Sequence, residues 1–258
     1  MRSLNPEWSP DSFHARVAAL VEIPANGKVL DLGCGKGLTL PYLLAASGPS
    51  GEVVGADRDQ RSLDAIRPGF PEEIANGRLT LTNVRIDDKL PFLAERFDSI
   101  VCQNVIECIP DKGALLTDIA RILKPGGVAV IGHHDFDGVL LASDDRDLTR
   151  RLVHGYADHT QEWQEVSDGQ MGRQLPGLVG ASPLSTAVTE TVLFVDRTLS
   201  RNSYARQHLE GMVSLARESG VTDDEAGAWL ARLEARAEAG QFYYALPWVY
   251  VVSRLPSP

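Results

Sequence analysis

The chain has 258 residues, 43% of them hydrophobic, and a formal net charge of −10 at pH 7. This length and apolar content suffice for a large α/β core. The acidic balance argues against a nucleic-acid partner, because phosphate contacts need a basic surface. Apolar runs stay well below the roughly 18 residues of a membrane span, and the first residues do not resemble a signal peptide. We therefore expect a cytoplasmic protein without a membrane partner; the sequence does not specify an oligomeric state.

The three cysteines are Cys34, Cys102 and Cys108. They form no C-x-x-C pair and no spacing typical of zinc ligands. Small buried thiols are the simplest interpretation, and no metal site is predicted.

The first predicted helix begins at Ser-Pro-Asp over residues 9–11. Phe13, Val17 and Leu20 follow at helical spacing, and Pro24 stops the helix. Next, an apolar strand over 28–32 is followed by glycines at every second position. Glycine accepts positive φ and lets a ligand approach the backbone, and the helix predicted over 38–47 offers unpaired N–H groups. The sequence therefore predicts a site for a polar or charged small molecule.

A second predicted strand, over 52–57, ends in Asp57. Its carboxylate can accept hydrogen bonds from both hydroxyls of a ribose. A dinucleotide fingerprint has G-x-G-x-x-G and an acidic residue about 20 residues later. The loop here reads G-x-G-x-G, one residue shorter, which disfavours a nicotinamide cofactor.

The pattern continues with a helix over 60–67, a loop over 68–77, strands over 78–82 and 97–104, a helix over 112–123 and a strand over 128–131. Strand, helix and strand at these lengths are typical of a doubly wound parallel α/β sheet. The strand over 97–104 has a polar end, which should emerge where strand ends line the ligand crevice. Gln103 and Asn104 are therefore expected beside the ligand.

Three stretches carry a family resemblance: D-L-G-C-G-K-G over 31–37, V-V-G-A-D over 53–57 and R-I-L-K-P-G-G-V-A-V-I over 121–131. They resemble the class I S-adenosylmethionine-dependent methyltransferases. The resemblance implies a Rossmann-like sheet of seven mostly parallel strands, with an antiparallel last strand and helical cap insertions. It also implies that the glycine loop and the acid after the second strand hold S-adenosylmethionine. The predicted cofactor-binding residues are Asp31, Gly33, Cys34, Gly35, Gly37, Asp57, Arg58, Asp87 and Asn104.

Two departures from the family pattern stand out. The stretch R-I-D-D-K-L-P-F over 85–92 resembles one in which an acid contacts the adenine amino group, but the family's position falls on Ile86 and the nearest acid is Asp87. A solvated acidic turn is the alternative there. V-I-E-C-I-P-D over 105–111 has Cys108 where the family has histidine.

Beyond the strand over 128–131, the sequence G-H-H-D-F-D contains His133 and His134. These histidines suit a general base or a substrate-orienting role, with ordinary loop packing as the alternative. A following helix is predicted to align Leu152, Tyr156, His159 and Trp163 on one face. That stripe is either core or an aromatic roof for a flat or cationic acceptor.

The segment over 172–179 resembles one in a bacterial small-molecule subset of the family, and Arg173 is expected to hold a carboxylate of substrate or protein. A strand over 186–197, a helical piece over 202–240 with a T-x-x-E capping box at Thr222, and a last strand over 243–254 complete the chain. We expect a single domain, 1–258. Its parts are a lid helix (1–27) with Trp8 near a ligand, the cofactor-binding core (28–132), the substrate cap (133–183) and C-terminal strands with a helical insertion (184–258).

The resemblance implies methyl transfer from S-adenosylmethionine to a small-molecule acceptor, at carbon, nitrogen or oxygen, in natural product biosynthesis. The predicted catalytic residues are His133, His134 and His159 as bases and Tyr156 as an orienting group. Two alternatives stay open: a nicotinamide-dependent oxidoreductase, and a non-methylating regulator or rearrangement catalyst that binds the same cofactor.

Overall fold

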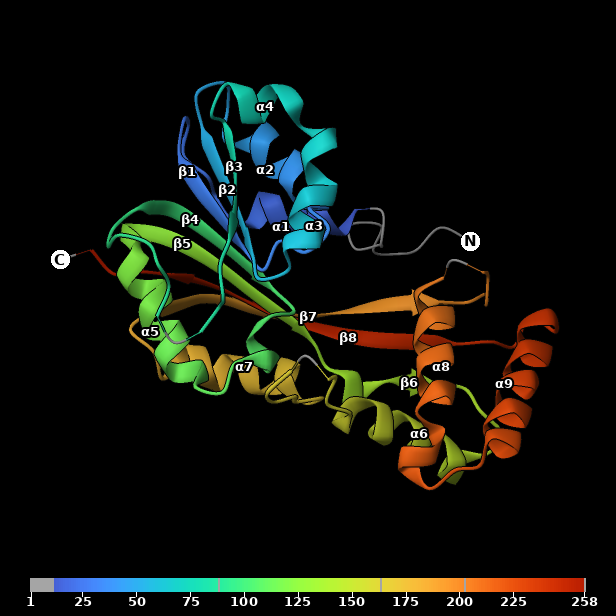
Figure 1. Ribbon diagram of the computed structural model, residues 1–258. Helices are drawn as coiled ribbons and strands as arrows, with labels where there is room; N and C mark the ends of the chain where they lie inside the picture. The colour runs from blue at the N-terminus through green and yellow to red at the C-terminus, as the bar shows by residue number, and fades with distance from the viewer. Residues whose placement is uncertain (1–11, 88, 163, 202, 258) are drawn as a thin grey trace.

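A computed structural model describes residues 12–87, 89–162, 164–201 and 203–257, which form an eight-stranded sheet (Figure 1). From one edge the order is β3, β2, β1, β4, β5, β8. The far edge of β8 pairs with β7, and the short β6 pairs with β8 at the start of that strand. The strands are β1 (Lys28–Leu32), β2 (Glu52–Asp57), β3 (Leu79–Asn83), β4 (Phe97–Gln103), β5 (Leu123–His134), β6 (Leu140–Leu141), β7 (Ser185–Asp196) and β8 (Tyr244–Arg254).

Strands β1 to β5 run parallel to one another, and β8 runs antiparallel to both β5 and β7. The predicted doubly wound, Rossmann-like α/β fold with an antiparallel last strand is therefore confirmed. Seven strands follow the prediction, and β6 is an addition. With only two residues, β6 is too short to show an alternating pattern in the sequence.

Helices cover both faces of the sheet, because successive strand residues point to opposite sides. Val29 and Val101 pack with the helices of one face, and Leu30 and Ile100 pack with those of the other. The first face carries α1 (Phe13–Leu20), α2 (Leu40–Ala46), α3 (Gln60–Ile66) and α4 (Pro71–Ala75), and the second carries α5 (Lys112–Ile122) and α7 (Met171–Gly180).

The prediction of a loop over 68–77 is wrong. The segment includes most of a 3-10 turn, η1 (Arg67–Gly69), and all of helix α4. Pro71 is the first residue of α4. Proline there loses no hydrogen bond and already has a helical φ, so it starts a helix rather than breaking one. The prediction treated the prolines only as breakers.

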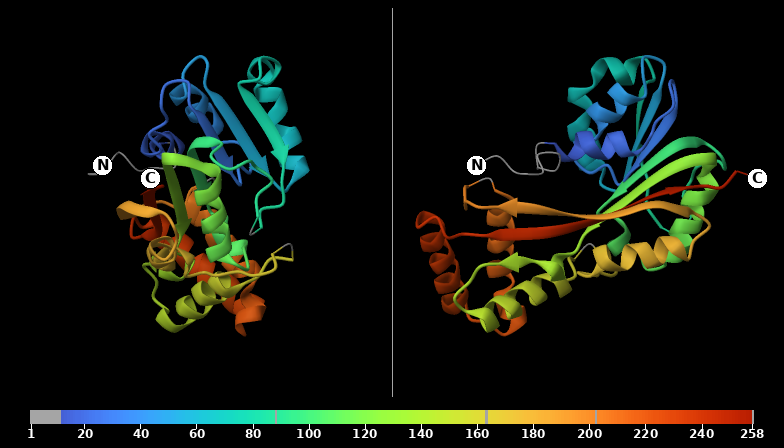
Figure 2. Two further views of the ribbon diagram at one scale, coloured as in Figure 1. Left: turned by 90° about the vertical axis from the view of Figure 1, so that its left-hand side faces the viewer. Right: turned by 180° about the vertical axis from the view of Figure 1, so that it is seen from behind.

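The long strands β7 and β8 extend past the rest of the sheet and carry a second helical layer (Figures 1 and 2). This cap consists of α6 (Arg146–Asp158), α8 (Tyr204–Ser214) and α9 (Asp223–Glu238), and it has its own apolar core. Trp229 is fully buried there, and its indole N–H donates to Thr149 Oγ1 at 2.9 Å. The predicted capping box is confirmed, because Thr222 and Glu225 bond reciprocally at the start of α9.

In the described part of the chain, no helix combines the length and apolar character needed to cross a membrane.

Candidate active site

The glycine loop lies between the end of β1 and the start of α2. Gly33, Gly35 and Gly37 all have positive φ, +78°, +50° and +72°. A Cβ on Gly33 would lie 2.1 Å from Val105 Cγ2, so the loop packs directly against the chain that follows β4. Among the described residues, no heavy atom lies within 4 Å of a Cβ built on Gly35. The loop is therefore closed on one side and open on the other, as a backbone cradle for a ligand requires.

Two aspartates support this loop. Asp57 accepts a hydrogen bond from Gly35 N at 2.8 Å through Oδ2 and from Asp59 N at 2.9 Å through Oδ1. Each carboxylate oxygen keeps a second lone pair. Asp31 is 3% exposed, and its Oδ2 has no hydrogen-bond partner among the described residues. Burial raises the pKa of Asp31 to about 7, and the nearby charge of Asp57 adds to the rise.

A buried carboxylate beside a second carboxylate favours a cationic ligand. S-adenosylmethionine carries a sulfonium, an ammonium and two ribose hydroxyls, so its charge matches Asp31 and its hydroxyls match Asp57. The open cradle at Gly35 leaves room for its backbone contacts. The residues present therefore fit the predicted cofactor.

The remaining predicted cofactor residues differ in how exposed their side chains are. Cys34 is buried in the core beside α2, and its N–H donates to Ala56 O at 3.0 Å while its carbonyl oxygen accepts from Gly37 N at 2.8 Å, so it shapes the loop. Arg58 is exposed. Asp87 is half-buried and bonds Arg85 Nε at 3.0 Å, whereas Ile86 is buried, so the side chain that points away from the core at this turn is the acid.

Asn104 has a positive φ of 52°, a conformation in which asparagine is enriched. Its N–H donates to Gly132 O at 2.9 Å, and its Oδ1 accepts from His134 N at 3.1 Å. Asn104 thereby fixes the end of β4 against the end of β5, and the chain turns directly into η2 (Ile106–Cys108).

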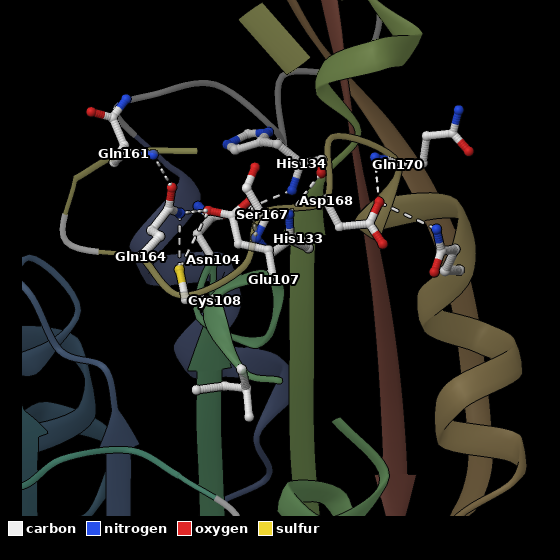
Figure 3. A network of polar contacts seen from close by, with 12 residues as sticks. Asn104, Glu107, Cys108, His133, His134, Gln161, Gln164, Ser167, Asp168 and Gln170 are labelled. Atoms are coloured by element: carbon white, nitrogen blue, oxygen red, sulfur yellow. Dashed lines mark hydrogen bonds and ion pairs between the residues drawn. The ribbon is translucent and has the colours of Figure 1, made fainter. Parts of the chain in front are cut away.

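A polar cluster lies where these two strands end (Figure 3). We call Glu107, Cys108, His133 and Gln164 the Glu107 cluster. Gln164 Nε2 lies 3.4 Å from Glu107 Oε1 and 3.1 Å from Cys108 Sγ, and His133 Nε2 lies 3.3 Å from Glu107 Oε2. Glu107 was not among the predicted site residues, because it lies within a turn that resembles the family pattern. An acidic residue four positions after a buried strand was the available signal.

Protonation within the cluster follows from its geometry. His133 Nδ1 lies 2.8 Å from the carbonyl oxygen of His134, so Nδ1 carries the proton and Nε2 is the accepting nitrogen of a neutral ring. Burial lowers the pKa of His133 to about 4. Burial also raises the pKa of Glu107 to about 7. Near neutral pH the carboxyl of Glu107 is therefore the group that exchanges a proton in this cluster.

His134 lies beside the cluster but faces the cap. Its Nε2 lies 3.0 Å from the hydroxyl of Tyr204, and burial together with His133 and His208 holds its pKa well below the ordinary value. His208 Nδ1 in turn bonds the hydroxyl of Tyr244 at 2.6 Å. The rings of His134, Phe136, Tyr156, Phe194, Tyr204 and His208 form a continuous aromatic group with centroids 4.5 to 6.2 Å apart.

The structure gives the predicted catalytic residues Tyr156 and His159 different surroundings. Tyr156 is half-buried within the aromatic group, and burial followed by the charge of Glu107 raises its pKa. His159 lies after the last residue of the helix, and its Nδ1 bonds Glu218 Oε2 at 2.7 Å. The predicted four-residue stripe is wrong at this point, because the helix ends at Asp158. Trp163 and Trp8 lie outside the described residues.

Arg173 holds carboxylates of the protein. Its backbone N–H and Nε donate to Asp135 Oδ2 at 2.9 and 2.7 Å, and its guanidinium also pairs with Asp137 at 3.1 Å. These bonds tie the end of β5 to α7. The two acids of the G-H-H-D-F-D stretch are thus both paired with Arg173.

Comparisons with known proteins agree with this geometry. A family model described as a methyltransferase domain matches residues 23–187. The ubiquinone/menaquinone biosynthesis C-methyltransferase UbiE of Syntrophotalea carbinolica is 31% identical over 172 residues, 65% of this chain and 68% of that protein. Other curated relatives are matched over about half of their length, 46% and 47% in two cases.

Two solved structures show the same fold. The Bacillus halodurans protein BH2331 has a TM-score of 0.62 at 13% identity, with 95% of this chain and 100% of that chain covered. The cyclase SpnF has a TM-score of 0.60 at 16% identity, with 96% and 81% covered.

Proposed function

Because the chain belongs to the class I S-adenosylmethionine-dependent methyltransferases, we propose that it transfers a methyl group from S-adenosylmethionine to a small aromatic acceptor, a specialised metabolite. The observation that carries this proposal is the open glycine cradle beside Asp57 and the buried Asp31, whose Oδ2 has no hydrogen-bond partner in the described part of the chain. The sulfonium supplies an already activated methyl group.

The protein's own contribution is to bind, orient and exclude water. We assign the methionine part to the backbone of Gly33 to Gly37 and the ribose to Asp57. The charge of Asp31 would balance the cationic groups, and Asp87 and Arg58 would border the adenine side. Asn104 fixes the strand ends that separate this region from the Glu107 cluster.

The aromatic group under the cap supports a flat acceptor. Phe136 lies against His133 of the Glu107 cluster, and Tyr156 and Tyr204 continue the aromatic group from Phe136 and His134. Stacking of such a ring on an aromatic ligand contributes about 0.5–1.5 kcal/mol per pair beyond its buried area. The relative UbiE, a ubiquinone/menaquinone biosynthesis C-methyltransferase, also supports an aromatic acceptor. A nicotinamide-dependent oxidoreductase is not favoured, because the matching family model is a methyltransferase domain.

The test is an assay with methyl-tritiated S-adenosylmethionine and a panel of catechols, hydroquinones, indoles and aromatic amines. We expect label in at least one acceptor, and loss of transfer in Asp57→Asn. Absence of transfer to the whole panel by protein that binds the donor would contradict methyl transfer to an aromatic acceptor and favour the non-methylating alternative. A protein that binds NADH and not the donor would overturn the family-based function altogether.

A further inference from the structure

We propose that Glu107 is the general base of the reaction, that His133 is its positioning residue, and that the acceptor's nucleophile is a phenol-type hydroxyl. This inference rests on the proposed methyl transfer. It assigns the proton-accepting role to a carboxylate rather than to the predicted bases His133, His134 and His159.

Glu107 has a suitable position between the cofactor loop and the cap. It lies two residues after Val105, which packs against Gly33. Its carboxyl faces the end of β5, where His133 is fully buried. The aromatic group begins on the cap side of the same strand end, since His133 and Phe136 have centroids 6.2 Å apart. We place the acceptor ring on this side, with its hydroxyl toward the carboxylate of Glu107.

Both oxygens of Glu107 have defined neighbours. Oε1 lies 3.4 Å from Gln164 Nε2, and Oε2 lies 3.3 Å from His133 Nε2. Because His133 keeps its proton on Nδ1, its Nε2 can only accept, and the contact becomes a hydrogen bond when Glu107 is protonated. His133 Nε2 is thus placed to accept a hydrogen bond from the protonated Glu107 carboxyl, which stabilises the proton on Glu107.

Burial and the groups around Glu107 together set the pKa of its carboxyl at about 7. Burial is the largest effect, and Asp168 raises the pKa further, while Lys112 lowers it. Hydrogen bonds from Cys108 and Gln164 also lower it. The elements packed around the carboxyl contribute these groups: Cys108 from η2, Lys112 from α5, His133 from β5, Tyr156 from α6, and Gln164 and Asp168 from the segment between α6 and α7. A base of this strength matches an operating pH near 7.

The acceptor O–H bond breaks and its proton goes to the Glu107 carboxylate. The oxygen electron pair forms the new bond to the methyl carbon while the S–C bond breaks, and that electron pair stays on sulfur as a neutral thioether. The proton on Glu107 is released to water when the product leaves. A phenol needs this base because it is protonated near neutral pH.

Glu107→Gln tests the proposal, with the exposed helix α4 residue Glu72→Gln as a matched control. S-adenosylhomocysteine affinity, measured by calorimetry, should stay within about twofold of the parent in both variants. Methyl transfer to catechol should fall about 10²- to 10⁴-fold in Glu107→Gln, the range typical of general-base loss. Glu107→Asp should restore part of it, and the parent's kcat/KM should rise with pH through about 7.

A series of nitro-substituted phenols separates a base from a structural residue. Phenols that are already ionised at the assay pH need no base, so the loss in Glu107→Gln should shrink to less than about tenfold for them. An equal loss across the series, or no loss at all, would overturn the role of Glu107 while leaving methyl transfer intact. Transfer to indoles or amines but to no phenol would overturn the acceptor class. A protein that binds no donor would instead refute the proposed function.

Discussion

The cofactor half of the molecule, residues 28–132, and the cap of α6, α8 and α9 differ in how their candidate sites are built. In the cofactor half, backbone conformation makes the site: three glycines with positive φ and two supporting aspartates lie within 27 sequence positions. In the cap, side chains from β5, α6 and α8 meet around one strand end. A backbone site leaves a short, fixed motif in the sequence, whereas a side-chain site assembled from distant segments does not.

If the cap and the cofactor half are structurally independent, a destabilising substitution in the apolar core of the cap should not change the affinity for the donor. Trp229→Ala is expected to lower the free energy of unfolding by about 3–5 kcal/mol, because it removes a fully buried ring and leaves Thr149 without its indole partner. Denaturant unfolding measures this loss, and calorimetry should find S-adenosylhomocysteine affinity within about twofold. Exposed Leu140→Ala is the control, with an expected change below about 0.5 kcal/mol. A large loss of donor affinity in Trp229→Ala would show that the halves are coupled.

The backbone site can be tested by two glycines of equal φ. Gly33 and Gly77 have φ of +78° and +79°, but a Cβ meets Val105 at the first and no described atom within 4 Å at the second. Alanine at either position costs about 1–2 kcal/mol of backbone strain, and at Gly33 the clash adds about 1–3 kcal/mol. Thermal unfolding of both variants measures the difference. Equal destabilisation would mean that Val105 moves aside and the loop is less rigid than described.

Asp31 should make donor binding depend on pH. With a pKa near 7 in the free protein, the carboxylate is mostly protonated at pH 6 and mostly ionised at pH 8, so affinity for S-adenosylmethionine should rise about tenfold over that interval. Calorimetry at several pH values checks this, and Asp31→Asn should bind weakly with little pH dependence. An affinity that stays flat in the parent would remove Asp31 from the site.

The same pKa has a consequence for stability. Between about pH 4 and pH 7 the unfolded chain has lost the proton of Asp31, whose ordinary pKa is 3.8, while the folded protein still holds it. The unfolded state therefore binds fewer protons in this interval, and the free energy of unfolding falls as pH rises through it. Ligand-free Asp31→Asn is therefore expected to melt at a higher temperature than the parent at pH 8. At pH 4 the two should melt at similar temperatures.

The smallest effect is expected at His159. Its side chain bonds Glu218, which is largely exposed, and a pair of this kind contributes at most about 1 kcal/mol. His159→Ala should keep methyl transfer within about twofold, in contrast to Glu107→Gln. A hundredfold loss would show that the segment after α6 brings His159 to the acceptor.

The sequence predicted the doubly wound sheet because each strand has an apolar run with clear turn signals, and it predicted the capping box at Thr222 because that motif is local. It missed α4, where Pro71 starts a helix, and β6, which has two residues. The predicted strand over 128–131 was too short, because β5 continues to His134. His133 and His134 therefore lie within the strand, paired with Val249 and Trp248 of β8, and not in a loop after it. Their side-chain neighbours Glu107 and Tyr204 are 26 and 70 positions away, too far for a local pattern to reveal. Glu107 lies in a turn that resembles the family pattern, and the sequence alone did not indicate a role for its side chain. The contact of that side chain with His133 of β5 does.

The most direct test is a calorimetric titration of the parent and Asp57→Ala with S-adenosylmethionine. We predict saturable binding of one donor per chain by the parent and a loss of affinity of at least about tenfold in the variant, because the ribose hydroxyls lose their acceptor and Gly35 N loses its bond. Absence of heat with the parent, or equal affinity in both proteins, would contradict a donor held between the glycine loop and Asp57.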